Sequence, residues 1–83
     1  MGRWKKDKKN HKAKAEANRH GAYVLFEPPK REWEGERWLV YDQKTGRHFL
    51  TYLPKKGVWF FGEHKGQGRM VDGIKYARER MRP

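Results

Sequence analysis

Short apolar runs alternate with turn residues between Gly21 and Gly62, which is the pattern of β-strands joined by tight turns. Aromatic and β-branched residues, which strands favour, dominate these runs. The predicted strands are Ala22–Phe26, Arg37–Tyr41, His48–Leu53 and Val58–Phe61. We therefore expect an antiparallel sheet of three to four strands.

The segments between these runs contain the residues of tight turns. Asp42 opens the segment DQKTGR and Gly46 stands near its end, where a positive φ is needed. This segment predicts a hairpin between the strands at 37–41 and 48–53. Pro54–Gly57 predicts a second turn, and the charged stretch Lys30–Glu36 predicts a connector after two prolines that end the first strand.

After Gly62 the apolar spacing becomes that of a helix. Apolar residues recur every three or four positions and so share one helical face: Met70, Val71, Ile74, Ala77 and Met81. Asp72 in the first turn and several arginines near the end suit the helix dipole. A small sheet needs a lid, so we expect this apolar face to pack on the sheet.

The first twenty residues differ in composition from the rest of the chain. They hold many cations, and their apolar side chains are limited to Met1, Trp4 and three alanines. Such a segment buries too little apolar surface to offset its ordering entropy. We therefore predict a disordered basic arm over residues 1–20, in which Lys12–Asn18 becomes helical once phosphates or a partner neutralise its charge.

Together these patterns predict an α+β fold. The expected domain spans residues 21–83 and consists of an antiparallel sheet of three to four strands with one C-terminal helix packed on it. The disordered basic arm precedes this domain.

Composition excludes several functional classes. The chain has no cysteine, which removes disulfides, thiolate metal sites and cysteine nucleophiles. It has no serine, and its four histidines do not stand in a metal-ligand spacing. The pair Glu63–His64 and the alternating Glu32, Glu34 and Glu36 fit solvated charges better than catalytic groups. We therefore expect neither an enzyme nor a metal or other cofactor.

The location of the protein is also constrained. No apolar run reaches the length of a membrane span, and the first residues lack the apolar stretch of a signal peptide. We expect a cytoplasmic protein, associated with a nucleoid or a ribonucleoprotein, that has no membrane partner.

Charge indicates the partner. The chain has 21 Lys and Arg against 10 Asp and Glu, a formal net charge of +11. Clustered cations of this kind usually bind phosphates, so we predict that the partner is a nucleic acid. DNA and RNA, in single-stranded or double-stranded form, are all candidates. The predicted binding residues are cations and sheet aromatics: Arg3, Lys5, Lys6, Lys8, Lys9, Lys12, Lys14, Arg19, Arg37, Trp38, Lys44, Arg47, Tyr52, Lys55, Lys56, Trp59, Lys65 and Arg69.

Aromatic residues stand on both alternating faces of each predicted strand, and one helix is too small to cover all of them. Some rings therefore form an exposed platform that contacts bases, or a second layer from the arm, from the connector with Trp33 or from a partner subunit covers them. Trp38 and Tyr41 should face opposite ways unless a bulge intervenes.

The glycine-rich segment Gly62–Arg69 lies between a predicted strand and a predicted helix. A plain flexible connector is the simpler interpretation of this segment. In the functional alternative, Lys65, Arg69 and backbone amides clamp one phosphate of a nucleic acid.

In its order of hairpin, strand and helix, the chain resembles the small DNA-binding domains of integrase N-termini and plant ethylene-response factors. In those domains a three-stranded sheet packs on one helix and lies in the major groove. The matching residues are Trp38, Asp42, Gly46, Arg47, Tyr76 and Ala77. The resemblance is one of architecture and implies binding to duplex DNA.

Two other functions fit the same composition. The first is a protein-binding module of the kind that phages and mobile elements encode, which docks on a host enzyme or a ribonucleoprotein through an uncovered aromatic face. The second is a ribosomal or virion component whose arm is ordered only within RNA or DNA. In both, the basic arm still contributes to association.

Overall fold

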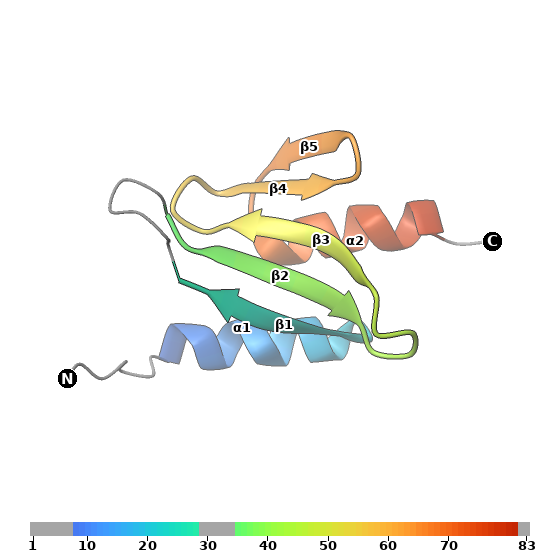
Figure 1. Ribbon diagram of the computed structural model, residues 1–83, viewed down its shortest axis with the longest axis horizontal. Coiled ribbons are helices and arrows are strands. Elements are labelled where there is room, and N and C mark those ends of the chain that lie inside the picture. The colour runs from blue at the N-terminus through green and yellow to red at the C-terminus, as the bar shows by residue number, and fades with distance from the viewer. Residues whose placement is uncertain (1–7, 29–34, 82–83) are drawn as a thin grey trace.

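The computed structural model describes residues 8–28 and 35–81 of the chain. An N-terminal helix precedes five strands, and a second helix follows them (Figure 1). In chain order the elements are α1 (Lys8–Arg19), β1 (Ala22–Glu27), β2 (Arg37–Asp42), β3 (His48–Leu53), β4 (Val58–Phe61), β5 (His64–Gln67) and α2 (Met70–Met81). The strands form one antiparallel sheet in the order β1-β2-β3-β4-β5. The α+β class is therefore confirmed.

Both helices lie on the same face of the sheet (Figure 1). α1 packs along β1, α2 packs across β3 and β4, and the two helices also contact each other. Between the sheet and the helices lies one core, whose largest fully buried side chains are Val40, Leu50 and Ile74. The predicted helical stripe is confirmed at its buried positions, but Met81 is exposed at the end of α2.

The predicted hairpin is present, with the predicted turn chemistry. Asp42 Oδ2 accepts a hydrogen bond from the Thr45 amide at 2.9 Å, and Gly46 has a φ of 74°. The Gly46 amide donates to the Asp42 carbonyl at 2.8 Å, which closes the turn. The second turn, at Pro54–Gly57, ends in a glycine with a φ of 64°.

The sheet has five strands, so the expectation of three to four was wrong. The segment predicted as a connector contains β5, which pairs with β4 through a turn at Gly62, where φ is 61°. β5 has the sequence HKGQ and lacks the apolar alternation that identifies a strand. It is held because Gly66 leaves room for the Trp59 indole, whose six-membered ring would overlap any β-carbon there.

The N-terminal segment was predicted to be disordered, and this was wrong for Lys8–Arg19, which forms α1. Ala13 and Ala17 stand four residues apart, so both reach the core from one helical face. α1 ends at Arg19, and Gly21 caps it: its φ of 71° and the hydrogen bond from its amide to the Asn18 carbonyl are those of a C-cap. Residues 1–7 lie outside the described residues.

Candidate nucleic-acid interface

The helices cover one face of the sheet and leave the other uncovered. We call the uncovered side the open face. Strand pairing places five residues in one row across all strands: Leu25, Leu39, Thr51, Phe60 and Lys65. A second row joins Tyr23, Tyr41 and His48. The register places two further sets on the same side of the sheet, the pair of Glu27 and Arg37 and the row of Leu53, Val58 and Gln67, in which Val58 is buried.

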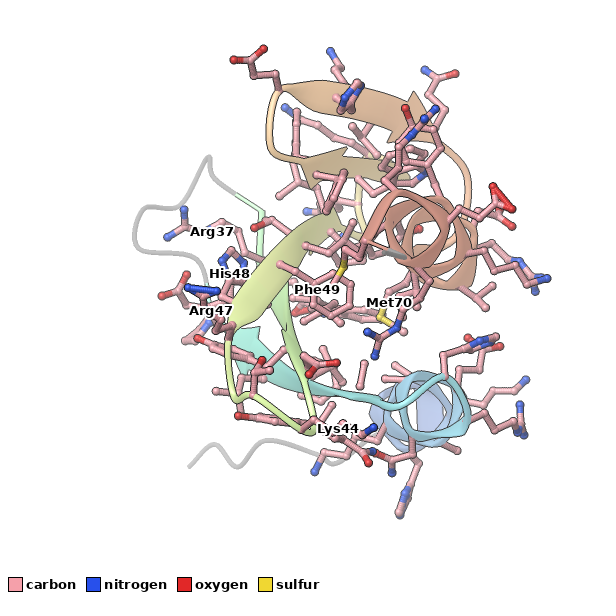
Figure 2. The ribbon with its side chains drawn as sticks, turned by 90° about the vertical axis from the view of Figure 1, so that its right-hand side faces the viewer. Arg37, Lys44, Arg47, His48, Phe49 and Met70 are labelled. Carbon is pink, nitrogen blue, oxygen red and sulfur yellow. The ribbon has the colours of Figure 1, made fainter. Side chains whose placement is uncertain are left out.

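A β-bulge between β2 and β3 decides which side chains reach the open face. The register shifts after Val40, so that Tyr41 pairs with His48. Figure 2 shows the result: His48 and Arg37 point away from the helices, whereas Phe49 points toward them. The Phe49 ring lies under the Arg78 guanidinium, 5.0 Å from its central carbon.

Planar side chains stack on the open face. The rings of Tyr23 and Tyr41 are nearly parallel, at an angle of 10° and a centroid distance of 5.3 Å. Tyr41 also contacts the His48 ring at 5.4 Å, and His48 Nε2 lies 3.0 Å from Thr51 Oγ1. Leu25, beside this cluster, is 50% exposed. The centre of the open face is therefore apolar, aromatic and partly solvated.

Cations lie around this centre. Arg37 forms an ion pair with Glu27 at 2.7 Å and stays exposed, and Lys65 Nζ lies 5.9 Å from the Phe60 ring centroid. Arg47 is exposed just before β3 and points to the same side as His48 (Figure 2). Turns carry further exposed cations at Lys44, Lys55 and Lys56, of which Lys44 lies near α1 (Figure 2). Arg37, Arg47 and Lys65 thus give the open face a cationic margin.

The other predicted cations are on or before α1. Lys12, Lys14 and Arg19 are exposed on this helix, and Lys14 Nζ lies 5.9 Å from the Phe26 ring centroid. The helix also contains Lys8 and Lys9, whose side chains are outside the described part of the structure. Arg3, Lys5 and Lys6 lie outside the described residues altogether.

Three rings predicted to stack on bases are buried under the helices instead. Trp38, Tyr52 and Trp59 are only 8%, 8% and 7% exposed. Trp38 packs against Phe26 and Tyr52, and Trp59 packs against Tyr76. The prediction that Trp38 and Tyr41 face opposite sides is confirmed, with Tyr41 on the open face. Sequence analysis missed Tyr23, Tyr41 and Phe60 as the accessible rings.

Burial also changes the acidity of Tyr52. Its hydroxyl donates to the Gly68 carbonyl at 2.9 Å. Removal from water, and then the negative charge of Asp72, raise the pKa of this phenol above its ordinary value of 10.0. Tyr52 therefore acts as a neutral hydrogen-bond donor that ties β3 to the start of α2.

The predicted phosphate clamp is not present as expected. Lys65 lies on the open face, and the Arg69 backbone amide donates to Asp72 Oδ2 at 2.9 Å. Asp72 is the third residue of α2, so this bond is half of a capping box. The Asp72 carboxylate thus engages the Arg69 backbone amide at the N-terminus of α2.

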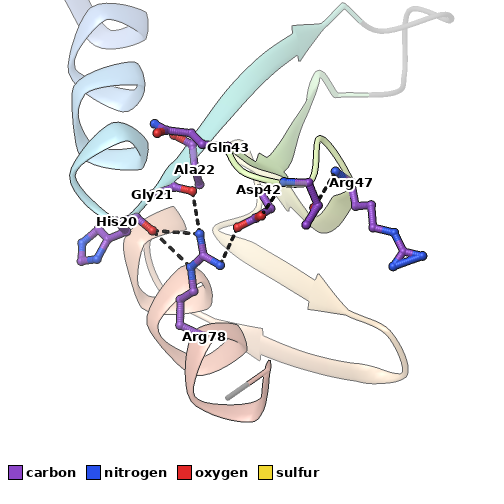
Figure 3. Close-up of polar contacts among 8 residues, drawn as sticks. His20, Gly21, Ala22, Asp42, Gln43, Arg47 and Arg78 are labelled. Atoms are coloured by element: carbon purple, nitrogen blue, oxygen red, sulfur yellow. Dashed lines mark hydrogen bonds and ion pairs between the residues drawn. The ribbon is translucent and has the colours of Figure 1, made fainter. Parts of the chain in front are cut away.

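Asp42 and Arg78 join the turn before β3 to both helices (Figure 3). Arg78 Nη1 donates to Asp42 Oδ1 at 2.8 Å, while its other nitrogens donate to the carbonyls of His20 and Gly21. The Thr45 amide, and then the Arg78 side chain, lower the pKa of the Asp42 carboxyl below its ordinary value of 3.8. This network positions the turn that presents Lys44 and Arg47.

The lowered pKa of Asp42 predicts a loss of stability in acid. The folded carboxyl binds its proton less tightly than the unfolded one, so the unfolded state takes up more protons below about pH 4. Stability from Asp42 is therefore present above that pH and is lost as the pH falls through the folded pKa. Thermal melts between pH 7 and pH 2 should show Asp42→Asn with a lower Tm at pH 7 and a smaller decrease in acid. Parallel melting curves for the two proteins would contradict this role.

The described residues give no sign of two other kinds of site. No group of three His, Cys, Asp or Glu side chains within residues 8–28 and 35–81 is arranged to hold a metal ion. Neither described helix is both long and apolar enough to cross a membrane.

Comparison with known proteins adds no identification: the chain matches no family model, no curated protein and no solved structure.

Proposed function

We propose that this protein binds nucleic acid through the open face of its sheet. The observation that carries the proposal is the joint presence of accessible rings and cations on the one sheet face that the helices leave uncovered. Tyr41 and Phe60 supply planar surfaces, and Arg47 and Lys65 supply charge beside them. Rings interleaved with cations bind bases and phosphates together.

Four of the acidic residues make contacts within the fold. Glu27 and Asp42 form ion pairs with Arg37 and Arg78, and Asp72 caps α2. Glu36 accepts a hydrogen bond from Trp38 Nε1 at 3.0 Å. These contacts leave the formal net charge of +11 unchanged, and a polyanion is the class of partner complementary to it.

The exposed cations of α1 supply a second contact. They lie on α1, which packs along β1 at the edge of the sheet. A nucleic-acid strand that extends beyond the open face on this side would reach them next. Contacts of this kind bind phosphates without reading sequence. The proposal covers both DNA and RNA.

Salt dependence tests the proposal. Replacing Arg47 by glutamine should weaken binding to labelled DNA or RNA and lower the slope of log K against log salt by about 0.7–0.9, the value of one phosphate contact. Lys75→Gln is the matched control, because Lys75 is exposed on α2, behind the sheet. Fluorescence anisotropy at several salt concentrations measures both. Absence of binding to either nucleic acid at low salt, or equal slopes for the two variants, would refute the proposal.

A protein-binding module is the second candidate function, and Leu25 is the observation that favours it. Leu25 is half-exposed and pairs with Leu39, which gives the open face an aliphatic area of the kind that protein interfaces bury. Leu25→Asp should then abolish capture of a protein partner by the tagged chain. If nucleic-acid affinity is unchanged while capture is lost, this second function is the correct one.

A further inference from the structure

We infer that the open face binds single-stranded nucleic acid, with unpaired bases on the apolar centre of the face and phosphates along its cationic margin. This inference rests on the proposed function and adds the class of nucleic acid. It follows from how apolar and charged groups are distributed over the five strands.

The centre of the open face is suited to the flat surfaces of bases. The row from Leu25 to Phe60 and the stacked pair of Tyr23 and Tyr41 offer aliphatic and aromatic surface, with Thr51 as the polar exception. Neighbouring strands lie about 4.8 Å apart, so a row across five strands is roughly 19 Å long. That length accommodates a short run of nucleotides.

A duplex fits this centre poorly. Its bases are stacked on one another, and it presents phosphates and polar groove edges to a protein. Set against Leu39, Tyr41 and Phe60, those polar groups would lose water and gain few hydrogen bonds, which is unfavourable. A single strand, by contrast, has unstacked bases whose faces are themselves apolar.

The margin places charge where the backbone of such a strand would lie. Lys65 pairs with Phe60 in the same row, and its Nζ lies over the Phe60 ring, 5.9 Å from the ring centroid. A base that stacks on this ring takes the place of the ammonium group, which then lies near the phosphate of that nucleotide. The His48 ring lies 5.4 Å from the Tyr41 ring, and Arg47, the residue before His48, points to the same side of the sheet (Figure 2). Phe60 and Tyr41 therefore lie close to cations of the margin, which is the arrangement that single-strand platforms use.

The charge of the margin also favours nucleic acid over a protein as the occupant. A protein partner would need an acidic rim around an apolar centre to match Arg47 and Lys65. In single-stranded nucleic acid, every nucleotide carries both a base for the apolar centre and an anionic phosphate for the cationic margin.

The test replaces rings while keeping apolar volume. Tyr41→Leu and Phe60→Leu remove a planar surface and retain an aliphatic one, and Leu39→Met is the matched control on the same face. Binding is measured by fluorescence anisotropy with labelled oligothymidylate, oligouridylate and a DNA duplex of equal length. Circular dichroism and thermal melting establish that each variant is folded.

Each ring variant should weaken oligothymidylate or oligouridylate binding about 5- to 150-fold, with an unchanged salt slope and unchanged duplex binding. Leu39→Met should bind as the parent does. If the duplex binds at least as tightly as the single strands and both ring variants bind normally, the inference is wrong and nucleic-acid binding stands. If none of the three probes binds, the proposed function itself is wrong.

Discussion

Ile74→Ala is expected to lower the free energy of unfolding by about 2–5 kcal/mol, the cost of deleting a fully buried aliphatic side chain and leaving a cavity. Ile74 is completely inaccessible at the middle of α2, where the helix meets the sheet. In a domain this small, such a loss removes much or all of the stability. Thermal and denaturant melts measure the effect.

Lys75→Ala is the control for this variant. It changes the neighbouring residue on the exposed side of α2, where substitutions usually alter stability by less than about 0.5 kcal/mol. Equal melting curves for Ile74→Ala and Lys75→Ala would show that α2 does not pack on the sheet as described.

Gly73→Ala is expected to destabilise the protein by about 1–3 kcal/mol, although the same change usually stabilises a helix interior. A β-carbon at Gly73 would lie 2.6 Å from Trp59 Cγ, closer than two carbons can approach. The indole fills the space between α2 and β5, with Gly66 on its other side. The free-energy cost of this steric overlap should therefore exceed the gain from the higher helix propensity of alanine.

A double-mutant cycle identifies the cause. Trp59→Ala removes Cγ and Cδ2, which lie 2.6 and 2.9 Å from the position of a β-carbon at Gly73. If overlap is responsible, Gly73→Ala should cost less in the Trp59→Ala protein than in the parent, and denaturant melts of the four proteins give the coupling. A stabilising Gly73→Ala in the parent would disprove the described packing of Trp59.

The features that could be predicted from the sequence are those that local chemistry decides. The hairpin follows from Asp42 and Gly46, because an Asx side chain and a positive φ specify a turn without help from the rest of the fold. The helix at 70–81 follows from its apolar spacing. The α+β class follows from the short apolar runs of the strands together with the helical spacing at 70–81.

The missed elements depend on contacts that the sequence does not display. β5 has no apolar alternation, and its strand conformation comes from pairing with β4 and from the room that Gly66 leaves for Trp59. α1 has only alanines to bury, and its order comes from close packing of Ala13 and Ala17 in the core. Secondary-structure propensity and composition do not reveal the pairing of β5 with β4 or the packing of α1 against the core.

The rings that the sequence analysis chose are not the rings that lie on the open face. Trp38, Tyr52 and Trp59 were chosen because large rings bind bases well, yet the same size makes them good core residues. One signal was present: Arg37 shares a strand face with Leu39 and Tyr41, and a charged residue marks that face as solvated. The bulge that brings His48 beside Tyr41 had no comparable signal.

The contacts of Arg78 have a consequence for the order in which the chain folds. Its bonds to the carbonyls of His20 and Gly21 join residues 58 and 57 positions apart, so they form only after α2 has docked. α1 adds little apolar burial beyond Ala13 and Ala17. We therefore expect α1 to dock late, once the sheet and α2 have assembled, and to be among the first elements to detach by local unfolding. α1 is thus held in place by a side chain of α2, 58 positions further along the chain.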